Sequence, residues 1–292
     1  LTKAIIRRKK SRFGNQRRIE NMKRLNFILA VILCTVVFFS CNEKAKNELP
    51  NVIYILADDL GYGDLGCYGQ TKIETPHLDR MAEQGMLFTQ HYSGSTVCAP
   101  SRSSLMSGQH TGHTPIRGNK ELQPEGQSPL PAETFTIAEL FKAKGYTTGA
   151  FGKWGLGFIG SEGDPNNQGF DEFYGYNCQR QAHRYYPKHL WHNNKKIILE
   201  GNDFKKTKTY AADIIHKKAL NFIEDNKNKP FFMFYPNVIR HAELIIPEGE
   251  IMQKYRGKFI EEKPYVGMWG AGSNNYGDET FDVMYYCDQM EP

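Results

Sequence analysis

The sequence predicts an α/β fold with a mainly parallel β-sheet that carries helices on both faces. Two observations predict it. From Pro50 onward, short apolar runs alternate with amphipathic helical segments, which is the order of parallel strands joined by helical crossovers. In addition, 40% of the 292 residues are hydrophobic and 24% are charged, which is typical of a globular chain. This composition excludes a wholly disordered chain, a collagen and a coiled coil.

The first expected segment is an export signal. Two basic residues follow Met22, residues 27–39 are apolar, and a small residue stands directly before Cys41. This order is typical of a bacterial lipoprotein signal in which Cys41 is lipidated, and the alternative is an ordinary signal peptide cut nearby. We therefore expect an exported protein, in the periplasm or outer membrane of a Gram-negative bacterium. The apolar run is too short to span a bilayer comfortably, so membrane contact is expected only through the lipid anchor.

The chain is accordingly divided into four segments. These are an upstream extension (1–21), the lipoprotein-type signal peptide (22–41), a polar linker (42–49) and the folded domain (50–292).

Most of the excess positive charge lies before the folded domain, which weakens the case for a nucleic-acid partner of that domain. The chain holds 37 Lys and Arg against 32 Asp and Glu. Ten of the basic residues but only one acid, Glu20, lie within residues 1–40, which leaves 27 basic and 31 acidic residues in the remainder. Because the folded part is slightly acidic, no nucleic-acid partner is expected.

The first half of the folded part predicts two strands and a helix. The β-branched run Val52–Ala57 is typical of a central strand covered on both faces. Thr75 and Pro76 supply an N-cap and a first-turn proline for a helix that ends at Gly85. Residues 87–92 are expected to form the next strand. The residues expected on the buried face of the helix are Leu78, Met81 and Ala82.

Two more helix and strand pairs follow. Thr136 begins a capping box for a helix that ends at Gly145 before the strand Tyr146–Phe151. The third pair is a helix from Tyr210 to about Asn226 and the strand Phe231–Tyr235. Residues 157–201 show no clear periodicity and are expected to be long loops that shape a cleft. The expected buried residues are Ile137, Leu140 and Phe141 in the first helix, and Ile215, Ala219, Phe222 and Ile223 in the second.

The residues just after each strand are the candidates for chemistry, because ligands of open α/β sheets bind beyond the carboxyl ends of the strands. Asp58 and Asp59 follow the first strand, and glycines follow them. Adjacent carboxylates at such a place suit a hard cation, Ca²⁺ before Mg²⁺. The alternative interpretation is a solvated turn, since Asp and Gly are ordinary turn residues.

A second candidate is the segment from Cys98 to Gly108. Pro100 at a first helical position places Cys98 at or just before a helix N-terminus, where unpaired N–H groups and the helix dipole favour an anion or a thiolate. Arg102, one turn further on, can add a contact to an anionic group. The residues alone leave open a reactive thiol or a helix cap with a buried Cys.

This segment resembles the signature C-x-P-S-R-x-x-L-x-x-G of the type I sulfatases, of the alkaline-phosphatase-like superfamily, at every defined position. The strand from Pro50 and the Asp58-Asp59 loop are similar to the first strand and metal loop of that family. Three further stretches fall in the family's order, and they begin at Thr75, Arg117 and Gly152. The resemblance implies an alkaline-phosphatase-like α/β fold.

The resemblance also implies site residues. Cys98 would be oxidised to formylglycine by a separate maturation enzyme, and its hydrated aldehyde would attack sulfur. Asp58, Asp59 and the residue at position 98 would bind Ca²⁺, which polarises the sulfate oxygens. Arg102 would stabilise the hydrated aldehyde, and Lys153, just after a predicted strand, would bridge it to a sulfate oxygen.

His241 is the remaining candidate, because the family has a His in a comparable place after a strand. There it contacts the sulfate or protonates the departing alcohol, and an ordinary imidazole pKa suits proton transfer near neutrality. The alternative is a surface His on a loop.

Two departures from the family pattern bear on activity. Many members carry a His two residues after the catalytic Lys, where this chain has Gly155. The family's later Asp-Asn pair, which completes the metal site, is not found after His241. The chain is therefore interpreted as the N-terminal part of a sulfatase with an incomplete catalytic domain, and residues 41–292 alone are expected to have weak or no activity.

The expected function is hydrolysis of sulfate esters of a carbohydrate or an aryl alcohol. One alternative is a phosphodiesterase or phosphonate hydrolase of the same superfamily. The other is a lipoprotein that binds sulfated glycans without turning them over.

Overall fold

The computed structural model describes residues 22, 24, 49–203, 206–241 and 247–259. Apart from residues 22 and 24, the predicted signal peptide, including Cys41, lies outside the described residues. The chain divides into two units, Leu1–Leu49 and Pro50–Pro292, and the second holds all the elements discussed below. Within the described ranges, no helix combines the length and the apolar character that crossing a membrane requires.

The second unit is built on a six-stranded sheet in the order β1-β8-β2-β3-β4-β5. The first four strands in this order run parallel, and β4 and β5 add antiparallel partners at one side. The prediction of a mainly parallel sheet is therefore confirmed. The strands are β1 (Val52–Ala57), β8 (Phe231–Asn237), β2 (Thr147–Lys153), β3 (Glu172–Tyr176), β4 (His189–His192) and β5 (Lys195–Ile198), and a separate hairpin pairs β6 (Asn202–Asp203) with β7 (Lys206–Thr207).

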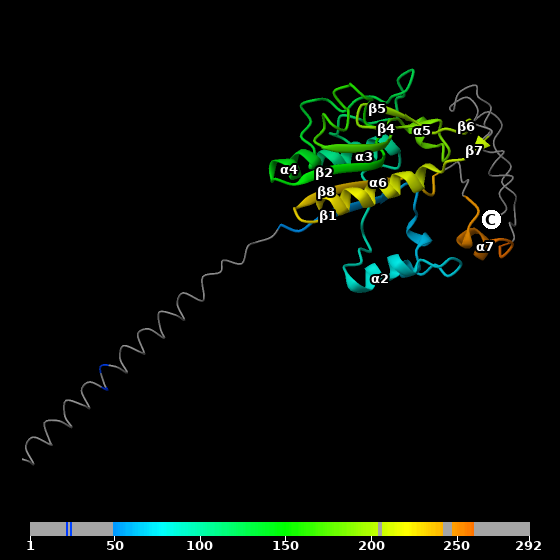
Figure 1. Cartoon of the computed structure of the whole chain (residues 1–292), viewed down its shortest axis with the longest axis horizontal. Helices are drawn as coiled ribbons and strands as arrows, with labels where there is room; N and C mark the ends of the chain where they lie inside the picture. The colour runs from blue at the N-terminus through cyan, green and yellow to red at the C-terminus, as the bar shows by residue number, and fades with distance from the viewer. Residues whose placement is uncertain (1–21, 23, 25–48, 204–205, 242–246, 260–292) are drawn as a thin grey trace, which may run out of the picture. The chain divides into compact units, whose positions relative to one another are not determined.

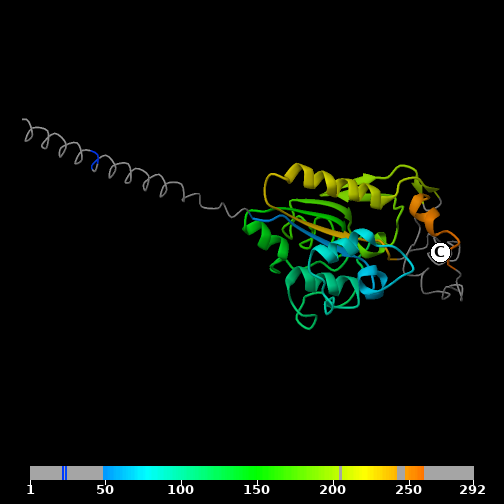
Figure 2. The same cartoon turned by 90° about the horizontal axis from the view of Figure 1, so that it is seen from below.

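Helices cover both faces of this sheet, as the sequence predicts (Figures 1 and 2). One face is covered by α6 (Ala211–Asn226), whose residues Ile215, Ala219 and Phe222 are buried against the sheet. The other face carries α3 (Cys98–Ser107) and α4 (Ile137–Ala143). Because each face has its own apolar cluster, the parallel strands in the middle of the sheet are buried on both sides.

The start of α4 has the predicted capping box. The Thr136 hydroxyl accepts a hydrogen bond from the Glu139 backbone N–H, and the Glu139 carboxylate accepts one from the Thr136 N–H. Ile137 and Phe141 pack against the core as expected. Leu140, which was expected to be buried with them, is exposed. The interior position of α4 is taken by Ala138 instead.

Three expectations for the first part of the domain are not met by the residues that the structure describes. Strand β1 pairs only with β8 among the described strands, and its Ile53 and Ile55 side chains are 45% and 57% exposed. Tyr54 and Leu56 face the apolar cluster beneath α3 and α4. The opposite face of β1 carries Ile53 and Ile55, and α6 packs mainly on β2, β8 and β3 rather than on this face. Residues 87–92 form no strand, and the apolar side chains of α2 (Pro76–Gln84) are not buried by the described part of the chain.

Residues 157–201 are also more regular than predicted. They contain β3, β4, β5 and the short helix α5 (Gln179–Ala182). Strand β3 was missed because it is buried on both faces, so it lacks the alternation of polar and apolar residues that marks a half-buried strand. Its position beside β2 matters for the site, because its carboxyl end lies at the same edge of the sheet.

A half-buried carboxylate ties a loop near this edge to the antiparallel strands. Glu125 pairs with His189 Nε2 at 2.8 Å and accepts a hydrogen bond from Trp191 Nε1 at 2.7 Å. Its backbone carbonyl accepts a hydrogen bond from Asn177 Nδ2 at 3.1 Å. Burial raises the pKa of Glu125, but the hydrogen bonds from His189 and Trp191 outweigh it, so the pKa lies below its ordinary value.

The substitution Glu125→Gln is expected to lower the free energy of unfolding by about 1 to 2 kcal/mol near neutral pH, because hydrogen bonds to an ionised group are lost. A lowered folded pKa stabilises the fold above the unfolded pKa, and this contribution is lost as the pH falls through the folded pKa. The difference between Glu125→Gln and wild type should therefore shrink in acid. Urea unfolding at several pH values measures it, with the exposed Glu133→Gln as control. A difference that is the same at all pH values would contradict the prediction.

Candidate active site

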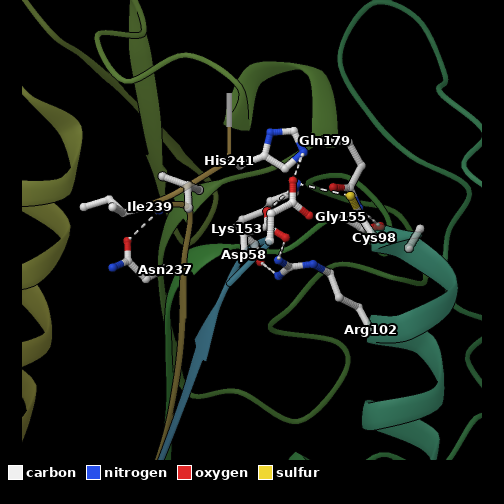
Figure 3. Close-up of polar contacts among 12 residues, drawn as sticks. Asp58, Cys98, Arg102, Lys153, Gly155, Gln179, Asn237, Ile239 and His241 are labelled. Atoms are coloured by element: carbon white, nitrogen blue, oxygen red, sulfur yellow. Dashed lines mark hydrogen bonds and ion pairs between the residues drawn. The ribbon is translucent and has the colours of Figure 1, made fainter. Parts of the chain in front are cut away.

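Three neighbouring parallel strands deliver polar side chains to one edge of the sheet. Asp58 follows β1, Lys153 ends β2, and His241 comes four residues after β8. Cys98 is the first residue of α3, which packs against the same part of the sheet. The structure thus brings together candidates that lie far apart in the sequence (Figure 3).

Lys153 is at the centre of this group. Its side chain is 0% exposed, and its Nζ lies 2.7 Å from Asp58 Oδ2. The same Nζ donates a hydrogen bond to Cys98 Sγ at 3.5 Å. A buried ammonium group is costly unless its charge is compensated, so the Asp58 carboxylate keeps this cation beside Cys98.

Arg102 provides a second buried cation. Its Nη2 lies 3.4 Å from Asp58 Oδ1, and its Nη1 donates a hydrogen bond to the Lys153 carbonyl. Burial raises the pKa of Asp58, but the charges of Arg102 and Lys153 outweigh it, so the pKa is held below its ordinary value. Arg102 Nε has no hydrogen-bond partner among the described residues. One carboxylate therefore faces two cations, which gives this part of the site excess positive charge.

Cys98 is half-buried at the helix N-terminus. The backbone N–H of the next residue, Ala99, donates to Asn119 Oδ1 at 3.0 Å, and no side chain caps the helix among the described contacts. Burial raises the pKa of the Cys98 thiol, but a hydrogen bond with His241 and the charge of Lys153 outweigh it, and the pKa lies below its ordinary value. The position thus favours an anion, as the sequence indicates.

His241 is held from several sides. Its backbone N–H donates to the Val238 carbonyl at 2.9 Å, and its Nε2 lies 3.4 Å from Asp59 Oδ2. The His183 ring stacks on the His241 ring, with centroids 4.2 Å apart and an interplanar angle of 11°. Burial lowers the pKa of His183 to about 2, so this ring is neutral near physiological pH. The His241 side chain is therefore largely buried and lies beside Asp59 and His183, rather than exposed on a surface loop.

Two residues near this group were missed by sequence reasoning. His183 and Gln179 both follow β3, and Gln179 Nε2 donates to the Gly155 carbonyl at 3.4 Å. They could have been identified in the same way as the other candidates, by examining the residues beyond the carboxyl end of each strand. That approach could not be applied here because β3 was interpreted as a loop.

The described residues supply only part of a calcium site. The Asp58 carboxylate already contacts Lys153 and Arg102, and Asp59 is 62% exposed with its side chain toward His241. No group of three or more His, Cys, Asp or Glu suited to a metal occurs within the residues that the structure describes. Since Ca²⁺ takes six to eight oxygen ligands, Asp58 and Asp59 can form one side of such a site but not all of it.

Comparison with known proteins gives a consistent result. A family model described as Sulfatase matches residues 50–289. Arylsulfatase A of Homo sapiens is 47% identical over 131 residues, which are 43% of this chain and 25% of the relative. N-acetylgalactosamine-6-O-sulfatase of Bacteroides thetaiotaomicron is 39% identical over 160 residues, 51% of this chain and 30% of the relative. The chain thus matches less than a third of the length of either relative.

Solved structures agree with these matches. The crystal structure of Ps i-CgsB has a TM-score of 0.60 at 27% identity, over 82% of this chain and 52% of that one. The same protein in complex with k-i-k-neocarrahexaose gives a TM-score of 0.61 at 26% identity, with the same coverage. A structure with its substrate D-glucosamine-2-N,6-O-disulfate gives a TM-score of 0.52 at 30% identity, over 70% of this chain and 40% of that one.

Proposed function

The chain belongs to the sulfatase family, and we propose that the protein containing it hydrolyses sulfate esters of a carbohydrate or an aryl alcohol. The observation that carries the proposal is the packing of Cys98 beside Lys153, with Arg102 and Lys153 sharing the Asp58 carboxylate. Two buried cations facing one carboxylate leave positive charge for a sulfate group. One relative named N-acetylgalactosamine-6-O-sulfatase and one similar structure in complex with k-i-k-neocarrahexaose support a carbohydrate substrate.

Formylglycine at position 98 fits the geometry of this site. The side chain of Cys98 is half-buried, next to an ammonium group and at the end of a helix dipole, which favours a polar or anionic group there. A separate maturation enzyme would oxidise the thiol-bearing carbon, supply the oxidant and remove the sulfur. A hydrated aldehyde at that position would supply a hydroxyl nucleophile for the sulfur atom and a second hydroxyl through which the sulfate could be released.

The other residues bind and move protons around that position. Lys153 Nζ donates to a sulfate oxygen while Asp58 holds the ammonium group in place. Arg102 stabilises negative charge next to position 98. His241 Nε2, which pairs with Asp59, delivers a proton to the departing alcohol oxygen. Asp58 and Asp59, together with position 98, would hold Ca²⁺ from one side, and the ion would draw electron density from the sulfate.

Export as a lipoprotein anchored at Cys41 forms part of the proposal, because the sequence before the folded unit has the order of such a signal. Labelling of the native protein with a radioactive fatty acid tests it, and a Cys41→Ala variant should lose both the label and the membrane association. Label that persists in that variant would contradict the assignment.

The proposed activity is tested on the protein produced together with a formylglycine-generating enzyme. The peptide across position 98 should have the mass of the aldehyde form. Sulfate release from 4-nitrophenyl sulfate should require added calcium and should stop with a chelator. Bis(4-nitrophenyl) phosphate is the control for phosphodiesterase activity. Faster cleavage of the phosphate diester, or sulfate release by protein with an unmodified thiol, would overturn the proposal.

A further inference from the structure

The Gln179 side chain occupies the space that a side chain at position 155 would need. Gly155 has a φ of +75°, in the region that favours glycine, and follows β2 by two residues. A Cβ added there would lie 2.2 Å from Gln179 Nε2 and 2.7 Å from Gln179 Cδ. Gln179 itself is 4% exposed. The polar group next to the end of β2 therefore comes from α5, and glycine at position 155 makes room for it.

The orientation of the Gln179 amide is fixed by the one side-chain hydrogen bond that it makes with the described residues. Its Nε2 donates to the Gly155 carbonyl, which can only accept, so exchanging the oxygen and the nitrogen would break this contact. The Oε1 atom is therefore an acceptor. It is buried and has no hydrogen-bond partner among the described residues. A buried acceptor without a donor is unfavourable. This indicates that another group, not present in the unmodified chain, donates a hydrogen bond to Oε1.

The direction of the side chain indicates where that donor would be. In Figure 3 the Gln179 side chain points toward Cys98, and its Nε2 contacts the backbone two residues after Lys153. Cys98 Sγ already accepts a hydrogen bond from Lys153 Nζ. A thiol is in any case only a weak donor, so Cys98 is poorly suited to satisfy Oε1. A hydroxyl on the same carbon atom is a strong donor as well as an acceptor.

We propose that Gln179 is a positioning residue for position 98, where its Oε1 accepts a hydrogen bond from a hydroxyl carried by that residue. The proposal rests on the proposed function, because conversion of Cys98 and hydration of the aldehyde put hydroxyls there in the native protein. Lys153 contacts the same residue, and the Gln179 bond fixes one hydroxyl, so that the other is free to face the substrate.

A double-mutant cycle tests this contact without any conversion, because Cys98→Ser places a hydroxyl at position 98 directly. Gln179→Leu is combined with Cys98→Ser and with Cys98→Ala, and unfolding by urea is measured for each protein. In the Cys98→Ser background, Gln179→Leu removes the hydrogen bond. In the Cys98→Ala background, it removes only an unpaired acceptor. The effect of Gln179→Leu on the unfolding equilibrium constant should differ about fivefold between the two backgrounds.

Gln181 provides the matched control on the same helix. It is another glutamine of α5 whose Nε2 donates to a backbone carbonyl, that of His189, and whose Oε1 has no partner among the described residues. Gln181→Leu should have the same effect in both backgrounds at position 98. If Gln179→Leu behaves in the same way, the contact does not exist and the inference is wrong. Gln179→Met repeats the cycle if the leucine variant does not fold.

The second measurement uses the converted protein and a readout other than turnover. A hydroxyl that donates to Oε1 favours the hydrate over the free aldehyde, so Gln179→Leu should speed labelling by an aminooxy reagent severalfold. Equal labelling rates of Gln179→Leu and wild type would overturn the inference. If wild type and variant both lack an aldehyde, the proposed conversion has failed, and the cycle with serine and alanine decides the contact alone.

Discussion

Replacing Cys98 by alanine is expected to abolish sulfate ester hydrolysis, with a loss of about 10,000-fold or more in kcat, the order found when a nucleophile is removed. The reason is that, in the proposed function, position 98 supplies the attacking group, while Lys153 and Arg102 only bind and stabilise charge. Fold and sulfate binding should remain, because the cations that face Asp58 are unchanged. Initial rates with 4-nitrophenyl sulfate measure the effect.

The serine variant separates attack from release. Cys98→Ser has a hydroxyl that can take the sulfuryl group from the ester and release the alcohol, forming a serine sulfate. It has no second hydroxyl on the same carbon to expel the sulfate. We therefore expect a burst of at most one alcohol per protein, and a peptide across position 98 that carries the added sulfate.

Cys67 is the control for both variants, because it is a half-buried free cysteine outside the group of site residues. Cys67→Ala should retain wild-type turnover. Continued turnover by Cys98→Ala, or many turnovers by Cys98→Ser, would show that position 98 is not the nucleophile.

The strand-end rule explains how much of the site could be predicted from the sequence. Asp58 and Lys153 were predicted because each follows or ends an apolar run that is typical of a strand. Cys98 and Arg102 were predicted because a proline marks the start of their helix. Parallel topology then brings these residues to one edge, although Asp58 and Lys153 lie 95 positions apart in the sequence. His183 and Gln179 were missed because β3 is buried on both faces and gives no alternating pattern. Their contacts with His241 and Gly155 depend on tertiary packing.

The fold was predictable where local signals and packing agree. The capping box of Thr136 fixes the start of α4, and the apolar stripe of α6 is buried as expected. The same kind of pattern misled at β1, whose β-branched residues indicate burial on both faces although Ile53 and Ile55 are exposed. β-branched residues indicate that a segment is suited to form a strand. They do not show which elements cover that strand, because those elements come from distant parts of the sequence.

The substitution Lys153→Met is expected to affect both stability and turnover. It leaves the buried Asp58 carboxylate with Arg102, at 3.4 Å, as the one close Lys or Arg among the described residues. Breaking a buried ion pair by removing one partner costs about 3 to 5 kcal/mol, and the remaining Arg102 places the expected loss near the lower end, about 3 kcal/mol. Loss of a preorganised donor to the sulfate should lower kcat/KM by about 100- to 1,000-fold.

The pH dependence gives the stability effect a definite sign. Arg102 and Lys153 hold the pKa of Asp58 below its ordinary value, so the ionised carboxylate stabilises wild type above its unfolded pKa, and the contribution is lost as the pH falls through the folded pKa. With Lys153 removed, burial raises that pKa. The stability difference between Lys153→Met and wild type should therefore be largest at neutral pH and shrink in acid, as measured by urea unfolding.

A second substitution distinguishes the two roles of Lys153. Adding Asp58→Asn to Lys153→Met removes the carboxylate charge that the first change left under-compensated, so part of the lost stability should return. Turnover should not return, because the donor to the sulfate is still missing and a proposed calcium ligand has also gone. The exposed Lys144→Met is the control, with wild-type stability and turnover expected. Unchanged stability in Lys153→Met would mean that Arg102 alone compensates Asp58, and unchanged turnover would remove Lys153 from the proposed site.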